Sequence, residues 1–248
     1  MSLTLITINL NNLSGLKKTV ASVIEQTLNV TEYIIIDGGS TDGSVDFLGE
    51  IQNPNVQWIS GPDTGVYHAM NKGIQKASSD FVLFLNSGDI LAHTAVLADI
   101  QTFFGKSKVN NQAIYYGFMR RGTPDDYSVV DVPSTLPIAY LIENSLPHPA
   151  TLIPRYLFQK FGCYDESYRI VSDWKFFMKC YFGRVAFCKL PVVVSYFDTG
   201  GLSSNHTQLF EERERVFAEM WKLRFCRGLI QTYRFLKYSL LKANPKIT

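Results

Sequence analysis

The first hundred residues alternate short apolar runs with stretches in which apolar residues recur every three or four positions. Runs rich in β-branched residues predict strands at 3–8, 32–36, 56–59 and 81–85. The helical spacing between them predicts helices over 16–27, 44–51 and 67–77. Strands that alternate with helices from residue 3 to about 105 predict an α/β fold with a doubly wound, mostly parallel central sheet.

The second half of the chain is less regular. Prolines punctuate its loops, and a helical pattern covers 173–182. Residues 200–204 form a candidate mobile loop, and a long terminal helix is predicted to begin near Gln208. Strand-like pieces lie at 113–117, 150–153, 185–189 and 192–197.

Two acidic turns follow strands of the first half. Asp37 directly follows the second predicted strand, and Asp89 closes a short turn after the fourth. Open parallel sheets bind ligands beyond the carboxyl ends of their strands, so both carboxylates are expected to point into one cleft. Glycines in both turns, including Gly88, let a phosphate approach the backbone closely. The pattern predicts a nucleotide site, with Asp37 at the base or ribose and Asp89 on a divalent cation held by the diphosphate.

Composition places the chain among ordinary folded proteins. Of its 248 residues, 46% are hydrophobic and 19% charged, which excludes disordered and collagen-like classes. Its four cysteines form no C-x-x-C pair, which suits a reducing compartment and argues against zinc. The N-terminus lacks a basic segment ahead of its apolar residues, and no run reaches the roughly 18 apolar residues of a spanning helix. We therefore expect a cytoplasmic protein.

The net charge of +2 is unevenly distributed along the chain. Residues 220–248 contain no acid, so the rest of the chain carries about −5. At 100° per residue, the apolar residues of this segment gather on one broad face. A basic amphipathic helix is typical of binding to an anionic membrane surface, but a helix docked on the domain with its lysines in water would show the same pattern. The cations are Lys222, Arg224, Arg227, Arg234, Lys237, Lys242 and Lys246, and the apolar residues are Trp221, Phe225, Leu229, Ile230, Tyr233, Leu236 and Leu240.

Three other enzyme classes do not fit the strand-end motifs. No G-x-G-x-x-G follows the first strand, which excludes a dinucleotide-dependent dehydrogenase. The glycine-rich basic loop of sugar nucleotidyltransferases is also missing there, and Asp37 precedes two glycines instead of the D-x-D pair of haloacid-type phosphatases. Positive charge confined to the tail, with no recognition motif, argues against nucleic-acid binding.

Several motifs stand in a fixed order along nearly the whole chain. They read IIDGGSTDGS at 35–44, GPDTGVYHAMNKGI at 61–74, FLNSGD at 84–89, PHPA at 147–150, VSDW at 171–174 and GGLS at 200–203. Together they resemble the inverting family 2 glycosyltransferases of the GT-A fold, especially the branch that builds colanic acid and related bacterial surface polysaccharides. The resemblance implies a GT-A fold and transfer of a sugar from a nucleoside diphosphate sugar.

The resemblance also implies donor-binding roles for residues of the first two motifs. Asp37 would bind the nucleotide base, and Asn9, which directly follows the first predicted strand, is a further candidate donor-binding residue. Asp63 and Lys72 would lie beside the donor sugar and phosphates. Structural alternatives exist, since Asp37 also suits an Asx-turn or helix cap and Lys72 a solvated helix position.

The turn at 86–89 departs from the aspartate-rich metal motif usual in this family. Only one carboxylate remains, so Asp89 would make most of the contact with Mg²⁺ or Mn²⁺, while Asn86, phosphate oxygens and waters complete the oxygen shell beside Gly88. Metal affinity is then expected to be weak without nucleotide. His206 would approach the metal or diphosphate when the glycine-serine loop closes. Alternatively, Asp89 only caps a strand-terminating turn.

Asp173 matches the family position of the catalytic base. Inverting transfer needs a base that takes the proton of the acceptor hydroxyl, and a helix start keeps a carboxylate ionised. The same placement suits a simple helix cap. Trp174 would stack on a sugar or fill the core. His148, fixed between two prolines, would bind the acceptor or phosphates, or be an ordinary loop residue.

We therefore expect a metal-dependent, hexosyltransferase-type enzyme that moves a sugar, expected to be UDP-linked, to a hydroxyl of a lipid-linked or growing surface glycan. The GT-A domain would span 1–207, with a nucleotide-sugar half at 1–105 and an acceptor half at 106–207, followed by a basic helical segment at 208–248. The protein would work in the cytoplasm, peripherally on the inner face of the cytoplasmic membrane if the helix binds lipid. The alternative is a catalytically silent protein that binds a nucleotide sugar or polysaccharide.

Overall fold

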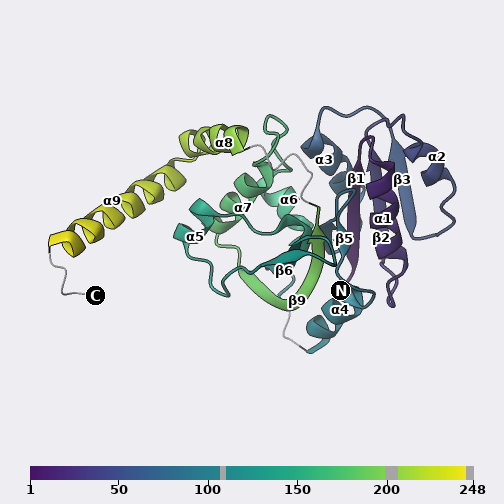
Figure 1. Cartoon of the computed structure of the whole chain (residues 1–248), viewed down its shortest axis with the longest axis horizontal. Helices are drawn as coiled ribbons and strands as arrows, with labels where there is room; N and C mark the ends of the chain where they lie inside the picture. The colour runs from purple at the N-terminus through teal and green to yellow at the C-terminus, as the bar shows by residue number, and fades with distance from the viewer. Residues whose placement is uncertain (107–109, 199–205, 244–248) are drawn as a thin grey trace.

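A computed structural model describes the backbone of residues 1–106, 110–198 and 206–243, and the side chains of these residues except 206 and 233–243. Within these residues nine strands form one sheet, in the order β3-β2-β1-β4-β8-β6-β9-β5, with β7 paired to β6 (Figure 1). The strands are β1 (Leu3–Asn9), β2 (Glu32–Asp37), β3 (Val56–Ser60), β4 (Phe81–Phe84), β5 (Ile90–Leu91), β6 (Ile114–Gly122), β7 (Tyr127–Val130), β8 (Thr151–Pro154) and β9 (Phe187–Phe197).

The sheet is mostly parallel, as predicted. Strands β1 to β4 run in one direction, and β6 and β9 pair in parallel. Strand β8 runs against both its neighbours, β4 and β6, and joins the two parallel parts. The carboxyl ends of β1, β2 and β4 therefore share one edge of the sheet.

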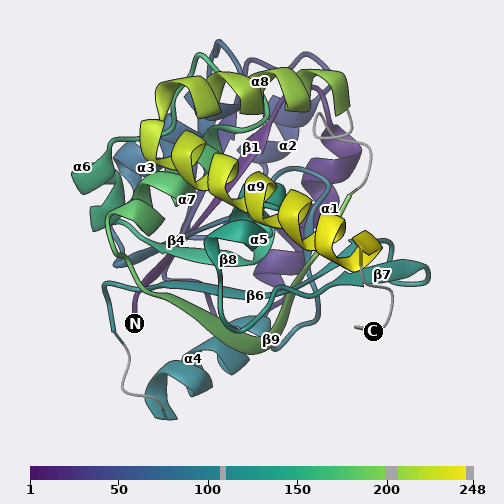
Figure 2. The ribbon, with the colours of Figure 1, turned by 90° about the vertical axis from the view of Figure 1, so that its left-hand side faces the viewer.

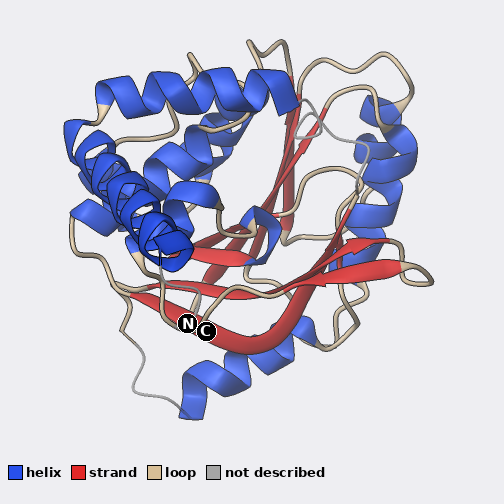
Figure 3. Cartoon of the chain, turned by 60° about the vertical axis from the view of Figure 1, so that its left-hand side comes forward, coloured by secondary structure: helices blue, strands red, loops and turns tan. Residues whose placement is uncertain are grey.

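Helices cover both faces of the sheet (Figure 3). Alternate residues of β1 and β2 belong to two separate apolar clusters, as the two-residue period of a strand requires. One cluster takes its helical residues from α1 (Leu13–Ile24), α2 (Ser44–Gly49) and α4 (Val96–Lys106). The other takes them from α3 (Val66–Lys76), α5 (Ile138–Glu143), α6 (Tyr156–Phe161), α7 (Ser172–Phe182), α8 (His206–Glu219) and α9 (Trp221–Ala243). The prediction of a doubly wound α/β fold is confirmed.

Two sequence predictions in the second half are wrong in detail. The strands predicted at 185–189 and 192–197 are one strand, β9, because Pro191 lies where the pairing with β6 shifts register and needs no ladder hydrogen bond there. The single terminal helix predicted from Gln208 is two helices, α8 and α9 (Trp221–Ala243), separated at Met220. The loop predicted at 200–204 lies outside the described residues.

Helix α9 has apolar residues on two sides. Leu223 is fully buried, and Cys226 and Ile230 pack against the core cluster that contains α7 and α8. Three further apolar side chains are exposed, and we call them the α9 stripe: Trp221 at 66%, Phe225 at 62% and Leu229 at 56%. Figure 2 shows α9 lying diagonally in front of α5. None of the helices within the described residues is both long and apolar enough to span a bilayer.

Candidate active site

The predicted donor residues follow the carboxyl ends of β1 and β2. Asp37, the last residue of β2, has no exposed surface. Its carboxylate accepts hydrogen bonds from Asn9 Nδ2 at 2.8 Å and Ser60 Oγ at 2.7 Å, and from the backbone N–H groups of Gly39 and Ser40 and the Ser40 hydroxyl. Burial acts to raise the pKa of Asp37, but these donors outweigh it and hold the pKa below its ordinary value. Asp37 is thus an ionised anchor for the turn that follows it.

Two buried amide oxygens at this edge of the sheet have no hydrogen-bond partner within the described residues. They are Oδ1 of Asn9, at the end of β1, and Oδ1 of Asn86, just after β4. Buried polar atoms normally find a partner, and one left unpaired at a ligand-binding edge indicates a contact that a ligand or ion completes. Both residues belong to the predicted donor-binding set.

The loop between β3 and α3 packs against the turn after Asp37. A Cβ at Gly38 would lie 2.5 Å from Asp63 Oδ2, so the bare glycine leaves room for that carboxylate. Asp63 Oδ1 also accepts the N–H of Gly65 at 3.0 Å, and Lys72 Nζ donates to Pro62 O at 2.8 Å. Asp63 and Lys72 therefore hold this loop beside the β2 turn.

Asp89 lies beside a second carboxylate, Asp198, which the sequence analysis did not identify. The N–H of Asp198 donates to Asp89 Oδ1 at 2.9 Å, and a Cβ at Gly88 would lie 3.0 Å from Asp198 Oδ2. Burial, and then the charge of Asp198, raise the pKa of Asp89 to about 7. The described residues contain no group of three or more His, Cys, Asp or Glu suited to a metal. Asp198 directly follows β9. A carboxylate placed just after a strand is the same signal that identified Asp89, so the sequence could also have indicated Asp198.

Asp173 lies in the first turn of α7 and is half-buried. The hydroxyl of Tyr67 lies 2.8 Å from Asp173 Oδ1 and 2.7 Å from the carbonyl oxygen of Ile170. Because Tyr67 is in the first turn of α3, directly after the loop that holds Asp63, this contact brings Asp173 to the donor edge of the sheet.

Helix α8 holds the backbone that leads into Asp173. The carboxylate of Glu212, which is 5% exposed, accepts the N–H groups of Arg169 and Ile170 at 2.9 Å each and that of Val171 at 3.2 Å. Val171 is the N-cap residue of α7, and Arg169 and Ile170 directly precede it, so the carboxylate holds the N–H groups of the backbone that enters the helix. The Glu212 side chain therefore fixes the position from which α7, and Asp173 with it, begins.

A half-buried cation of α8, Arg213, lies near enough to Asp173 for their charges to interact. The guanidinium carbon of Arg213 lies 4.6 Å from the ring centre of Trp174, and Arg213 Nη1 donates to Glu143 O at 2.8 Å. Burial lowers the pKa of Arg213, and the charge of Asp173 acts to raise it. Trp174 itself is 1% exposed and donates its indole N–H to Leu141 O at 2.7 Å, so it belongs to the core and presents no face to a sugar.

His148 links β4 to the region of Asp173. Its ring stacks on Phe84 with centres 4.8 Å apart, and its Nε2 lies 2.9 Å from the Tyr164 hydroxyl. Burial lowers the pKa of His148, partly offset by the charge of Asp173. His148 is therefore a packed, neutral residue of the site. His206, the predicted metal or diphosphate residue, begins α8, but its side chain lies outside the described residues.

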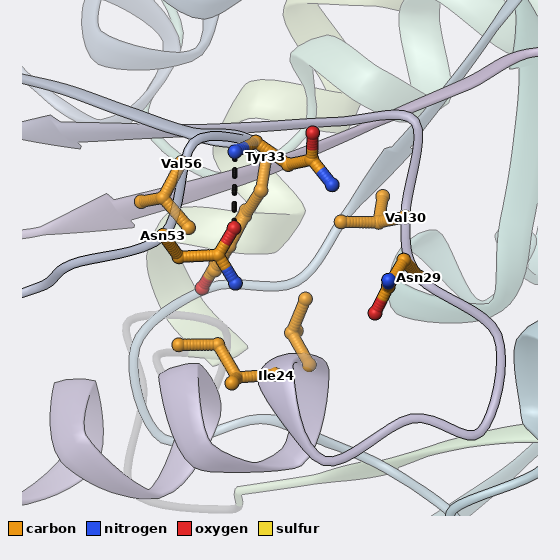
Figure 4. A pocket seen from close by; sticks show the side chains of 8 residues that line it. Ile24, Asn29, Val30, Tyr33, Asn53 and Val56 are labelled. Carbon is orange, nitrogen blue, oxygen red and sulfur yellow. Dashed lines mark hydrogen bonds between the residues drawn. The ribbon is translucent and has the colours of Figure 1, made fainter.

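A small pocket at the opposite edge of the sheet is a poor alternative site. Figure 4 shows it between the end of α1 and the starts of β2 and β3. Its lining carries apolar and amide side chains and a tyrosine but no charged group: Val23, Ile24, Asn29, Val30, Tyr33, Asn53, Asn55 and Val56. The predicted donor-binding residues and Asp173 lie at the other edge of the sheet.

Comparison with known proteins agrees with this geometry. The family model described as "Glycosyl transferase family 2" matches residues 4–146. The chain belongs to this family. It is 33% identical over 229 residues to an uncharacterized glycosyltransferase of Mycobacterium tuberculosis, covering 90% of this chain and 82% of that one. It is 31% identical over 201 residues to a PGL/p-HBAD biosynthesis glycosyltransferase of the same species, covering 79% and 76%.

Solved structures of S. aureus TarS share the fold of this family 2 chain. TarS 1-349 in complex with UDP-GlcNAc superposes with a TM-score of 0.71 at 18% identity, over 88% of this chain and 66% of that one. The chain spans 39% of the longer TarS structure, with a TM-score of 0.68. The GT-A fold expected from the sequence is therefore confirmed.

Proposed function

We propose that this family 2 glycosyltransferase is a hexosyltransferase-type enzyme that moves a sugar from a UDP-linked donor, with inversion, to a hydroxyl of a lipid-linked or growing surface glycan. One observation carries the proposal: the Tyr67 contact brings the Asp173 carboxylate to the sheet edge where Asn9 and Asn86 leave buried oxygens unpaired. The UDP-GlcNAc complex of TarS supports the choice of donor, and the Mycobacterium tuberculosis relative named as a PGL/p-HBAD biosynthesis glycosyltransferase supports sugar transfer in a biosynthetic role.

In this proposal, the donor binds at the carboxyl ends of β1 and β2 and at the β3–α3 loop. Because the Asp37 carboxylate is buried and already accepts five hydrogen bonds, it acts on the base through the turn that it orders. Asn9 offers an unpaired oxygen beside it, and Asp63 and Lys72 shape the loop that faces the sugar and phosphates.

The transfer step uses Asp173 as general base. Its carboxylate takes the proton of the acceptor hydroxyl as the hydroxyl oxygen forms a bond to the anomeric carbon. The bond from that carbon to the diphosphate oxygen breaks on the opposite face, and the electron pair leaves with UDP, so the configuration inverts. The charge of Arg213 and the positive end of the α7 dipole both attract this carboxylate.

The residues after β4 and β9 fit a divalent cation. Asp89, Asp198 and the unpaired Asn86 oxygen are hard oxygen donors. Burial of Asp89, and then the charge of the exposed Asp198, raise the pKa of Asp89 to about 7, and a bound cation would favour its ionised form. Asp89 would hold Mg²⁺ or Mn²⁺ with Asn86 and Asp198, beside the bare backbone of Gly88, and His206 remains a candidate fourth residue. When bound, the ion supplies positive charge to the departing diphosphate.

Turnover separates this proposal from a catalytically silent binding protein. The full chain is assayed for UDP release and product formation with UDP-, GDP- and dTDP-sugars, Mn²⁺ and a lipid-linked glycan acceptor. Asp173→Asn is expected to keep donor binding in calorimetry and to lose transfer, since only the base is removed. Donor binding without turnover by the unaltered chain would support the silent protein, and an active Asp173→Asn variant would disprove the assignment of the base.

We also propose that helix α9 binds the cytoplasmic face of a membrane. The α9 stripe, Trp221, Phe225 and Leu229, lines a groove with Arg224, Gly228 and Thr232, opposite the side that packs on the domain. Residues 220–248 carry seven cations and no acid, which complements anionic lipid headgroups. We assign the stripe to the interfacial region of an anionic bilayer, where the acceptor's lipid resides.

A further inference from the structure

The hydroxyl of Tyr67 has one proton and two acceptors within hydrogen-bond distance. The carbonyl oxygen of Ile170 lies at 2.7 Å and Asp173 Oδ1 at 2.8 Å. A carbonyl and an ionised carboxylate both only accept, so the single proton serves one of them fully at a time. The arrangement is fixed, since Tyr67 is 5% exposed and the N–H of Ile170 is held by Glu212.

The phenol remains protonated in this setting. Burial, followed by the negative charge of Asp173, raises the pKa of Tyr67 well above its ordinary value. The other titratable groups that act on Asp173 are Arg213 on α8, with His148 and Tyr164 on the segments that precede α7. Among the described residues, Tyr67 is the side chain that hydrogen-bonds to Asp173.

We propose that Tyr67 is a positioning residue that serves Asp173 in both of its protonation states, an inference that rests on the proposed role of Asp173 as base. Before transfer, the Tyr67 proton lies toward the charged carboxylate, which is the stronger acceptor. This bond orients Asp173 and stabilises its ionised form. Tyr67 therefore prepares the base without touching the substrate.

Proton transfer reverses the polarity of the contact. Once Asp173 has received the acceptor's proton, that proton can lie on Oδ1 and point at the phenol oxygen. The Tyr67 proton then goes to Ile170 O, which is already at 2.7 Å. No heavy atom has to move, so the protonated base also finds a partner as soon as it forms.

The test compares two tyrosines that each donate a hydroxyl to a backbone carbonyl. Tyr67→Phe removes the contact with Asp173, whereas Tyr116→Phe removes a buried hydroxyl that lies 2.7 Å from Pro133 O. The full chain is assayed for kcat and KM across pH. Phe fills the same space, and similar melting temperatures of the two variants verify that both are folded.

Loss of a donor to the ionised carboxylate makes it protonate more easily. In Tyr67→Phe the acid limb of the pH–rate profile is expected to move up by about one pH unit, so turnover on that limb falls roughly tenfold. The KM for the sugar nucleotide is expected to stay unchanged, and Tyr116→Phe is expected to keep the limb of the unaltered chain. A purely structural role would lower stability and leave the limb in place.

The outcomes separate the two proposals. If the unaltered chain transfers no sugar from any of the donors tested, the proposed function itself fails. If it is active and the acid limb of Tyr67→Phe coincides with that of Tyr116→Phe, the role of Tyr67 is refuted while the proposed function stands.

Discussion

Replacing Glu212 with glutamine is expected to damage both stability and turnover. The Glu212 carboxylate accepts three backbone N–H groups at 2.9, 2.9 and 3.2 Å and is 5% exposed, so water cannot replace it. Glutamine keeps one accepting oxygen and places an NH₂ group against the remaining N–H. Two charge-assisted bonds become neutral, and one buried donor loses its partner.

The size of the effect follows from these bonds. Each weakened bond costs on the order of 1 kcal/mol, and an unpaired buried N–H costs about 1 to 3 kcal/mol, which gives about 3 to 5 kcal/mol in the free energy of unfolding. For a chain of this length, the melting temperature is expected to fall by roughly 6 to 20 °C. Because the released backbone leads into Asp173, kcat is expected to fall while UDP-sugar affinity stays unchanged.

The matched control is Glu211→Gln, which removes the same charge from an exposed position of the same helix. Thermal melting, calorimetry with UDP and turnover are measured for both variants. If Glu212→Gln melts within about 1 °C of Glu211→Gln, the reasoning from the three hydrogen bonds is wrong.

Three further outcomes are expected. Asp89→Asn should reduce the affinity for UDP in the presence of Mn²⁺ to the value measured with a chelator. Asp125→Asn, on an exposed turn, should leave that affinity unchanged. Unchanged Mn²⁺-dependent UDP binding by Asp89→Asn would contradict the metal assignment. Changing the three residues of the α9 stripe to serine should weaken binding to anionic vesicles by about 3 kcal/mol, on the order of a hundredfold. The control Val129→Ser removes exposed apolar area elsewhere and should leave vesicle binding unchanged. If the stripe variant loses self-association but binds vesicles equally well, a second copy of the chain covers the stripe. Although burial acts to raise it, the pKa of Asp165 is lowered to about 2, mainly by a hydrogen bond from Lys175, so the pair contributes stability above about pH 4 that disappears as the pH falls toward 2. In Lys175→Met, melting temperature plotted against pH should fall less steeply over that interval, and a slope equal to that of the unaltered chain would refute the coupling.

The first half of the fold was predictable because its pattern is local. The four strands predicted there differ from the observed strands by one residue at most, since each is a short apolar run bounded by polar turns. Asp37 and Asp89 were found because they stand after such runs. The second half lacks that regularity, and a strand interrupted by Pro191 was taken as two pieces, because the bulge that accommodates proline depends on pairing with β6.

The supports of the candidate base could not be found in the same way. Glu212 lies 41 to 43 residues from the N–H groups that it holds, and no local pattern indicates which surface of α8 is buried. In the sequence, Tyr67 was only the first residue of the helix predicted over 67–77, with nothing to indicate a contact with Asp173. Their roles depend on how α3, α7 and α8 meet over the sheet, which is a property of the tertiary structure.

The reversed direction of β8 decides which parts of the chain can reach the ligand edge. At the carboxyl edge of a parallel sheet, each strand places the residues that follow it. Because β8 is antiparallel to β4, it begins at this edge, and the residues that precede β8 lie there instead. His148 is one of them. The stretch at 131–147 thus enters from outside the parallel framework. Under the proposed function, insertions or deletions in that stretch are expected to change acceptor choice while the proposed nucleotide site at the ends of β1, β2 and β4 keeps its dimensions.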